Sequence, residues 1–149
     1  MNHEGRVTVP ADRDPVWNAI TDPEVLTACV MGAEDISRVS DAEYEGVIRQ
    51  GFAGVSVTME GTVRIEDREP PDRMAFSGVG TDDRTNSRME ADADVVLVEA
   101  DAGTALEYDV DVSFAGRLAT LGARVLRRQI RTNVETYFNN LVEHVEEDR

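Results

Sequence analysis

Residues 89–114 read MEADADVVLVEADAGTALEYDVDVSF, and this stretch decides the fold class. Apolar residues alternate with polar ones on both sides of the turn Asp101-Ala102-Gly103, as in two antiparallel strands with one buried and one solvated face. The expected inner face carries Met89, Ala91, Ala93, Val95 and Leu97 on one strand and Thr104, Leu106, Tyr108, Val110, Val112 and Phe114 on the other. The hairpin predicts a sheet that packs one face against another layer.

The rest of the chain extends this pattern on both sides. A two-residue periodicity from Asp35 to Phe114 predicts a meander of strands, and residues 4–9 predict one more strand. Between them, Asp14-Pro15 and Asp22-Pro23 each place a capping residue before a proline, which predicts two short helices over 14–20 and 23–29. Residues 116–147 contain no proline and have helical periodicity, so a long C-terminal helix is expected.

These elements predict an α+β fold in a single domain over residues 1–149. A curved seven-stranded antiparallel sheet, two short helices and the long C-terminal helix enclose an apolar cavity. No repeat, low-complexity tract or linker divides the sequence. All elements are therefore expected to pack on one core.

The composition is strongly acidic, with thirty Asp and Glu against fifteen basic residues, all of them arginine. Carboxylates spread over the whole chain are typical of a halophile with high internal salt, where charge is screened within about 3 Å at molar ionic strength. The alternative, a face for a basic partner, needs the acids gathered in one place. A net charge of −15 disfavours nucleic-acid binding because phosphate is repelled.

Several classes of protein and site are disfavoured. The apolar runs are too short to span a membrane, and the first residues lack an export signal, so we expect a cytoplasmic protein. Cys29 is the single cysteine, and the histidines His3 and His144 stand far apart in the sequence, so neither a disulfide nor a metal ligand set is expected. The apolar neighbours of Cys29 favour a buried thiol, and no catalytic triad can be assembled.

Three blocks of sequence resemble the family of the carbon monoxide dehydrogenase G subunit, CoxG, within the START or SRPBCC superfamily of helix-grip proteins. The most specific is DPEVLTACVMGAE at residues 22–34, and GTALEY at 103–108 and AGRLATLGARVL at 115–126 support it. Met31 departs from the pattern, because the family usually has proline there. The resemblance implies a helix-grip fold and a non-catalytic accessory protein of a molybdenum-type carbon monoxide dehydrogenase, one that recruits the enzyme to the membrane and handles a quinone.

Together these features predict a binding protein for a lipophilic small molecule, without a resident cofactor apart from a bound quinone or other lipid. The hydroxyls of Tyr44 and Tyr108 and the amide of Gln50 are candidates to bond a quinone oxygen, or else backbone or water at the edge of the core. Methionines suit either an adaptable pocket or an ordinary core. The side chains expected to line the cavity are Trp17, Leu26, Tyr44, Gln50, Phe52, Met59, Phe76, Met89, Leu106, Tyr108, Leu121 and Val125.

The C-terminal helix carries two apolar stripes on nearly opposite sides, one around Leu121 and one around Phe138. One straight helix cannot bury both, so it either breaks near residues 127–129 or exposes its first stripe. The residues expected to contact an anionic membrane or an acidic partner are Arg117, Leu118, Arg124, Arg127, Arg128 and Arg131. The alternative is that these arginines pair with the protein's own acids.

The preferred function is thus an accessory lipid carrier, cytoplasmic and in peripheral contact with the inner face of the membrane, that serves a molybdenum hydroxylase-type enzyme. An SRPBCC-type cyclase or hydrolase acting on a hydrophobic small molecule is the main alternative. It requires ionisable side chains that converge in the cavity. A client-binding co-chaperone is a third reading and requires an open apolar groove.

Overall fold

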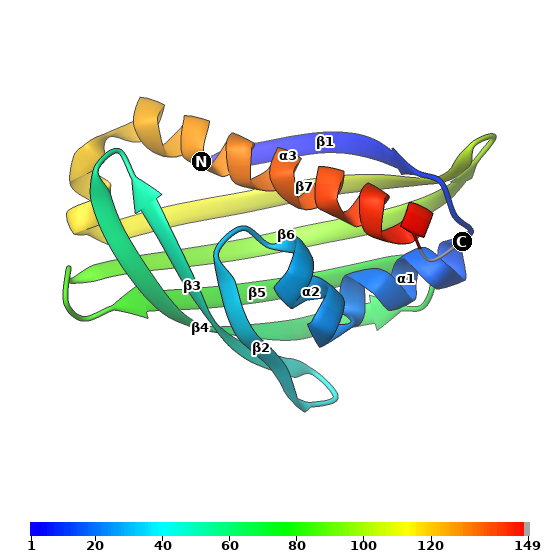
Figure 1. The fold of residues 1–149 in the computed structure, drawn as a ribbon, viewed down its shortest axis with the longest axis horizontal. Helices are drawn as coiled ribbons and strands as arrows, with labels where there is room; N and C mark the ends of the chain where they lie inside the picture. Colours follow the sequence, from blue (N-terminus) through cyan, green and yellow to red (C-terminus); the bar gives the residue numbers. More distant parts are fainter. Residues whose placement is uncertain (148–149) are drawn as a thin grey trace.

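The computed structural model describes residues 1–147 as one twisted sheet with all helices on one side (Figure 1). The strands lie in the order β1-β7-β6-β5-β4-β3-β2, and every pair is antiparallel. Their bounds are β1 Asn2–Val9, β2 Ala33–Ser40, β3 Glu43–Phe52, β4 Val55–Glu69, β5 Arg73–Asp82, β6 Ser87–Ala100 and β7 Gly103–Gly116. The predicted seven-stranded antiparallel sheet is confirmed.

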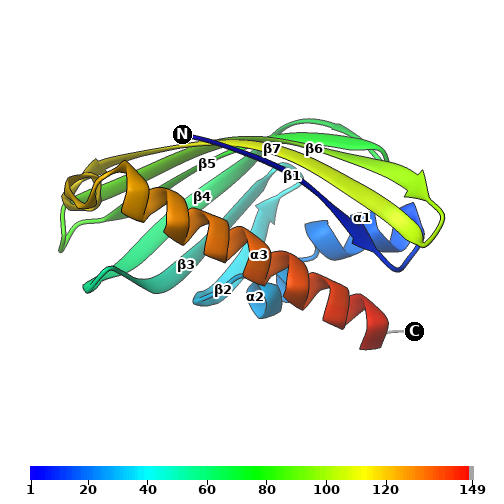
Figure 2. The same ribbon diagram turned by 90° about the horizontal axis from the view of Figure 1, so that it is seen from above.

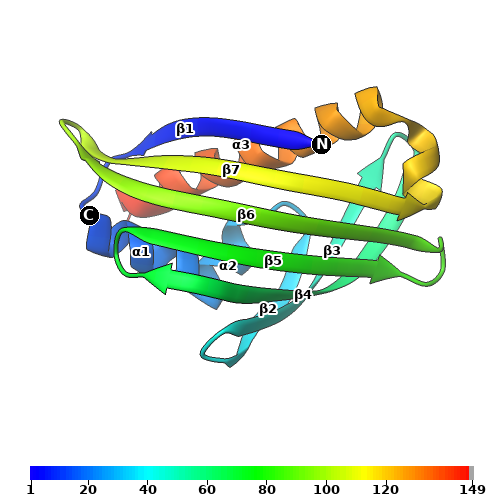
Figure 3. The same cartoon turned by 180° about the vertical axis from the view of Figure 1, so that it is seen from behind.

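The helices cover only the concave face of the sheet. Helices α1 (Arg13–Thr21) and α2 (Pro23–Cys29) fill one end, and α3 (Ala123–Glu147) crosses the face obliquely (Figure 2). The view from behind has no helix in front of the strands (Figure 3). The carboxylates of β6 and β7 that alternate with the core residues therefore lie exposed on the outer face.

The caps of the short helices differ from each other. Asp22 caps α2 as predicted, since its Oδ1 accepts a hydrogen bond of 2.9 Å from the backbone N–H of Glu24. The prediction that Asp14 caps α1 is wrong. Asp12 stands at the cap position without a side-chain hydrogen bond, and Asp14 lies in the first turn, where its charge suits the helix dipole.

The C-terminal segment breaks earlier than predicted. Residues Arg117–Leu121 form a short 3-10 helix, η1, and α3 begins only after Gly122, which has a φ of +89°. The predicted break at 127–129 is wrong because a glycine adopts this left-handed backbone with little strain, whereas Arg127, Arg128 and Gln129 do not. The break turns the first apolar stripe toward the sheet, where Leu118 is fully buried, and leaves the second stripe on α3.

Two hydrophobic clusters hold the layers together, at opposite ends of the inner face. The first joins α1, α2 and the end of α3 to the strands and includes Val16, Trp17, Leu106, Leu141 and Val145. The second joins η1 and the start of α3 to the other end and includes Phe52, Val57, Met59, Leu118 and Leu126. Burying each large aliphatic side chain contributes about 1.5–3 kcal/mol, so these clusters are the main source of stability.

Candidate functional site

The inner face of the sheet is only partly covered at its centre, between the two clusters. We call this area the central patch; it consists of Gly61, Val63, Gly78 and Ala91. Val63 lies on the inner face by the alternation of β4, yet 36% of its surface is exposed. A Cβ placed at Gly78 meets only the side chain of Val63 and the backbone of Thr62 within 4 Å, so no side chain of α3 fills this space.

The register of the strands explains why the centre is open. Gly46 lies opposite Gly61, and Gly61 opposite Gly80, while Gly78 lies opposite Ala91. Residues without long side chains therefore meet across four neighbouring strands. The backbone of α3 lies nearest to β1, β3, η1 and the short helices, while its side chains reach β4, β5 and β6 in the two clusters at the ends of the face. The result is an apolar surface beneath a helix that does not fill it.

Amide side chains tie α3 to the edge of this patch. The Asn133 amide donates to Gln50 Oε1 at 2.9 Å, and the Gln50 amide donates to the Met31 carbonyl at 2.7 Å. Gln129 donates in turn to Asn133 at 3.1 Å, and Asn140 donates to the Cys29 carbonyl at 3.0 Å. These bonds fix the orientation of α3 on the β3 side. They also engage Gln50, which the sequence offers as a ligand contact.

The two candidate tyrosines have different surroundings. The Tyr44 hydroxyl donates to the Thr21 carbonyl at 2.5 Å, and its ring faces the Arg38 guanidinium at 5.4 Å. Tyr44 therefore has the backbone partner that the sequence leaves open as an alternative. Tyr108 stacks on Phe138 with ring centres 5.0 Å apart, and among residues 1–147 its hydroxyl has no hydrogen-bond partner. Burial, and then the charge of Glu135, raise the pKa of Tyr108.

The residues predicted to line the cavity lie in different parts of the inner face. Trp17, Phe76, Leu106 and Tyr108 belong to the first cluster, and Phe52, Met59, Met89 and Leu121 to the second. Tyr44 is buried, and Leu26, Gln50 and Val125 are half-buried outside both clusters. These side chains thus do not line one enclosed space; they flank the central patch from its two ends and its β3 side.

The arginines of residues 117–131, which we call the arginine segment, are exposed. None of Arg117, Arg124, Arg127, Arg128 and Arg131 forms an ion pair or hydrogen bond through its side chain with any residue of 1–147. The alternative that they pair with the protein's own acids is therefore wrong for the part of the chain described. Leu118, predicted to contact a membrane or partner, is fully buried and is not part of this surface.

The buried titratable groups Asp82, Cys29 and Tyr137 do not converge, because they lie at opposite ends of the inner face. Asp82 is buried at one end, where backbone N–H groups, first that of Thr58, hold its pKa below the ordinary value. Burial raises the pKa of Cys29 and that of Tyr137 at the other end, so both stay neutral. Within residues 1–147 no group of His, Cys, Asp and Glu is arranged to hold a metal ion.

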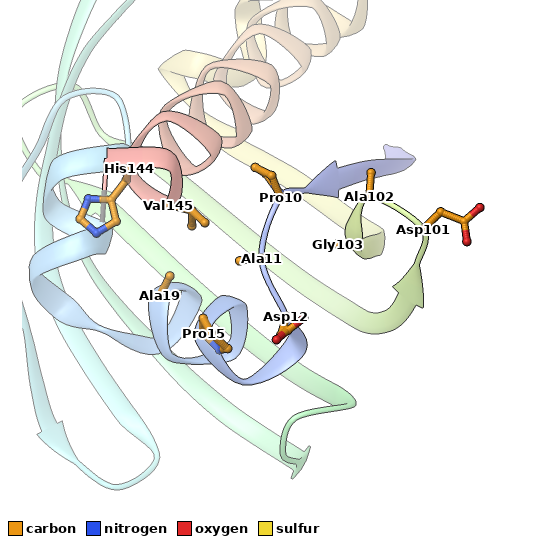
Figure 4. A pocket seen from close by; sticks show the side chains of 10 residues that line it. All are labelled: Pro10, Ala11, Asp12, Pro15, Ala19, Asp101, Ala102, Gly103, His144 and Val145. Carbon is orange, nitrogen blue, oxygen red and sulfur yellow. The ribbon is translucent and has the colours of Figure 1, made fainter. Parts of the chain in front are cut away.

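A separate hollow of about 550 Å³ opens at the end of the sheet between α1, α3 and the β6–β7 turn (Figure 4). Its lining includes Pro10, Ala19, Gly103 and His144. The carboxylates of Asp12 and Asp101 point in different directions rather than toward a common point. This hollow has neither the apolar surface of the central patch nor a convergent polar set.

Residues 5–146 match the family model of the carbon monoxide dehydrogenase G subunit (CoxG). The chain belongs to the CoxG family. The match covers almost the whole sequence and includes the central patch and the arginine segment. Among curated proteins, no match is found.

Solved structures similar to this CoxG-family chain share its helix-grip fold. A conserved protein from Geobacillus kaustophilus is 20% identical with a TM-score of 0.90, covering 99% of this chain and 96% of that one. A protein from Thermus thermophilus is 18% identical with a TM-score of 0.75, covering 99% of both chains, and one from Rhodobacter sphaeroides is 22% identical with a TM-score of 0.70, covering 98% and 92%. At these identities the likeness establishes the fold alone.

The sequence did not predict the side-chain hydrogen bonds of Asn133 and Asn140 or the place of the glycines in the site. Asn133 and Asn140 follow the buried stripe of α3, and their amides give no periodic signal of their own. Gly61 and Gly78 are visible as glycines on the inward parity of their strands, but only the register places them near Ala91. No helix within residues 1–147 is long and apolar enough to cross a membrane.

Proposed function

We propose that this CoxG-family chain is a non-catalytic accessory protein that binds a lipophilic, quinone-like molecule between the sheet and α3. The observation that carries the proposal is the central patch, where Val63 stays 36% exposed on the inner face. Exposing an apolar surface to water is unfavourable. Covering it with an apolar ligand stabilises the complex by about 25 cal/mol per Å² of apolar surface removed from water. A flat lipophilic ring or chain fits over glycines and alanine.

The arginine segment supports a second part of the same function, recruitment. Four of its arginines lie on the first three turns of α3, exposed and without carboxylate partners. In a chain of net charge −15 this is the place where an anionic surface is attracted rather than repelled. We propose that it contacts an anionic membrane beside a carbon monoxide dehydrogenase-type molybdenum oxidoreductase, in keeping with the name of the family.

Ligand binding is tested with a matched pair of variants on β5. Gly78→Leu places a side chain into the central patch, whereas Val79→Leu enlarges the side chain on the outer face of the same strand. Added quinone is expected to raise the melting temperature of the wild type and of Val79→Leu, but not of Gly78→Leu. The proposal fails if quinone shifts none of the three proteins and extraction of the native protein yields no lipophilic molecule.

Recruitment is tested by sedimentation with vesicles. The wild type is expected to bind vesicles of anionic phospholipid and not vesicles of neutral phospholipid. Replacing Arg124, Arg127, Arg128 and Arg131 with Gln should abolish the binding, at about 1 kcal/mol per arginine. Equal binding to both vesicle types, or binding that survives the four replacements, contradicts this part of the proposal.

A further inference from the structure

Four polar groups without partners gather at the rim between β1 and α3. His3 lies on the inner face of β1 opposite Val110, and its Nε2 is buried without a hydrogen-bond partner among residues 1–147. The pKa of His3 lies below its ordinary value of 6.5, through burial first and then through the charges of Arg127, the amino terminus and Arg131. Both guanidinium groups therefore lie close enough to act on this imidazole.

The Tyr108 hydroxyl completes the rim from β7. It lies over Gly5, the next inward residue of β1, since a Cβ placed at Gly5 would collide with the Tyr108 oxygen. Glu135 is the carboxylate whose charge acts on Tyr108, and it lies four residues beyond Arg131 on α3. The side of the rim nearer His3, Arg127 and Arg131 is therefore the positive side.

This rim is continuous with the central patch. The inner face runs from His3 on β1 through Val110 on β7 and Ala93 or Ala91 on β6 to Gly78 on β5, without a charged side chain. Three strand spacings of about 4.8 Å separate β1 from β5, so the path is about 14 Å long. A long-chain fatty acid spans this distance, and a small neutral ring does not reach both ends.

We infer that the preferred ligand is an acidic amphiphile, whose apolar chain lies on the central patch and whose anionic head lies at the rim between Arg127, Arg131 and His3. This rests on the proposed ligand-binding function and adds the class of ligand. Two guanidinium groups without carboxylates supply charge-assisted donors for the head. The His3 imidazole supplies a third, and an anion beside it stabilises its protonated form.

The test compares hexadecanoic acid with hexadecanol, which has the same chain and no charge. The wild type is expected to bind the acid at least about tenfold more tightly, as one charge-assisted hydrogen bond requires. Arg127→Gln with Arg131→Gln should remove this preference and leave hexadecanol binding unchanged. Arg124→Gln with Arg128→Gln, which removes the same charge from the same helix away from His3, should retain it.

The pH dependence gives a second measurement. Because the bound anion favours protonated His3, whose ordinary pKa is 6.5, the affinity of the wild type for the acid should rise between pH 8 and pH 6, and that of His3→Gln should not.

Hexadecyl phosphate in place of the acid separates a general anion site from a carboxylate site. Equal affinity for acid and alcohol, or equal losses in both arginine pairs, overturns the inference while leaving neutral-ligand binding intact. Failure of both ligands and of quinone overturns the proposed function itself.

Discussion

The arginines of the first 116 residues and those of the arginine segment have opposite surroundings. Each arginine from Arg6 to Arg88 has a partner: six pair with carboxylates, two donate to backbone carbonyls and one lies over a tyrosine ring. From Arg117 to Arg131, among the residues described, none has an ion pair or hydrogen bond. In so acidic a protein, basic residues find partners readily. The five consecutive exceptions on one segment are the contrast on which the proposed contact with an anionic surface rests.

Because no ion pair within residues 1–147 holds the arginine segment to the sheet, we expect the burial of Leu118 and Leu121 to hold it there. We expect Leu118→Ala to lower the free energy of unfolding by about 2–5 kcal/mol, because it opens a cavity under a fully buried side chain. Leu121→Ala, at a half-buried position, should cost less. Urea denaturation measures both. A loss for Leu118→Ala no larger than that for Leu121→Ala would mean that η1 is not anchored as described.

An arginine that pairs with carboxylates should matter for stability, and an arginine of the arginine segment should not. Arg13 pairs with Asp72 and, at 3.4 Å, with Glu99, and its side chain is about one third exposed. Arg13→Gln is expected to cost about 1 kcal/mol, and Arg128→Gln to stay within about 0.5 kcal/mol of the wild type. Thermal unfolding in the same buffer compares them. A similar decrease in the free energy of unfolding in both variants would contradict the difference between the paired arginines and those of the arginine segment.

Salt should weaken the repulsion between carboxylates on the outer face of the sheet. Asp92 of β6 lies directly opposite Asp111 of β7, and Asp94 opposite Asp109, so like charges face each other across the hairpin. Asp92→Asn is expected to stabilise the protein by about 0.2–1 kcal/mol in dilute salt, and by less in about 1 M salt. The control is Asp101→Asn in the turn, which faces no carboxylate across a strand. A gain that persists in molar salt contradicts an electrostatic origin.

The smallest effect concerns His3, where the arginine segment meets the sheet. Since the folded pKa lies below 6.5, the unfolded chain takes up the proton first as pH falls. The melting temperature of the wild type, relative to His3→Gln, should be constant above about pH 7 and decline below pH 6.5 toward pH 5. Parallel curves for the two proteins over this range would show that His3 is not held neutral by its surroundings.

Strand periodicity was the reliable part of the sequence. The hairpin of residues 89–114 has the predicted inner and outer faces, because a period of two fixes the side on which each residue points. The cap at Asp22 and the position of both short helices also follow from local chemistry. These features depend on residues close together in the chain.

The position of the helix break and the division of the core were not predictable in the same way. Gly122 is one of several glycines in the sequence, and only the burial of Leu118 against Phe52 and Met59 makes it the place where the helix starts again. Likewise, Phe52 and Trp17 both point into the core but lie at opposite ends of the sheet. Strand register and sheet curvature decide such distances, and neither can be read from periodicity.

The glycines of the inner face differ in whether they can be replaced by a larger residue. A Cβ at Gly78 or Gly80 meets its nearest neighbours at 3.4–3.5 Å, an ordinary contact, whereas at Gly61 the carbonyl of Val79 stands at 3.3 Å. A single methyl group can thus be added on β5 without moving the backbone. Each added methyl group reduces the space above the sheet by one carbon, so substitutions at Gly78 and Gly80 would select a shorter or slimmer ligand under the proposed function while the scaffold stays the same.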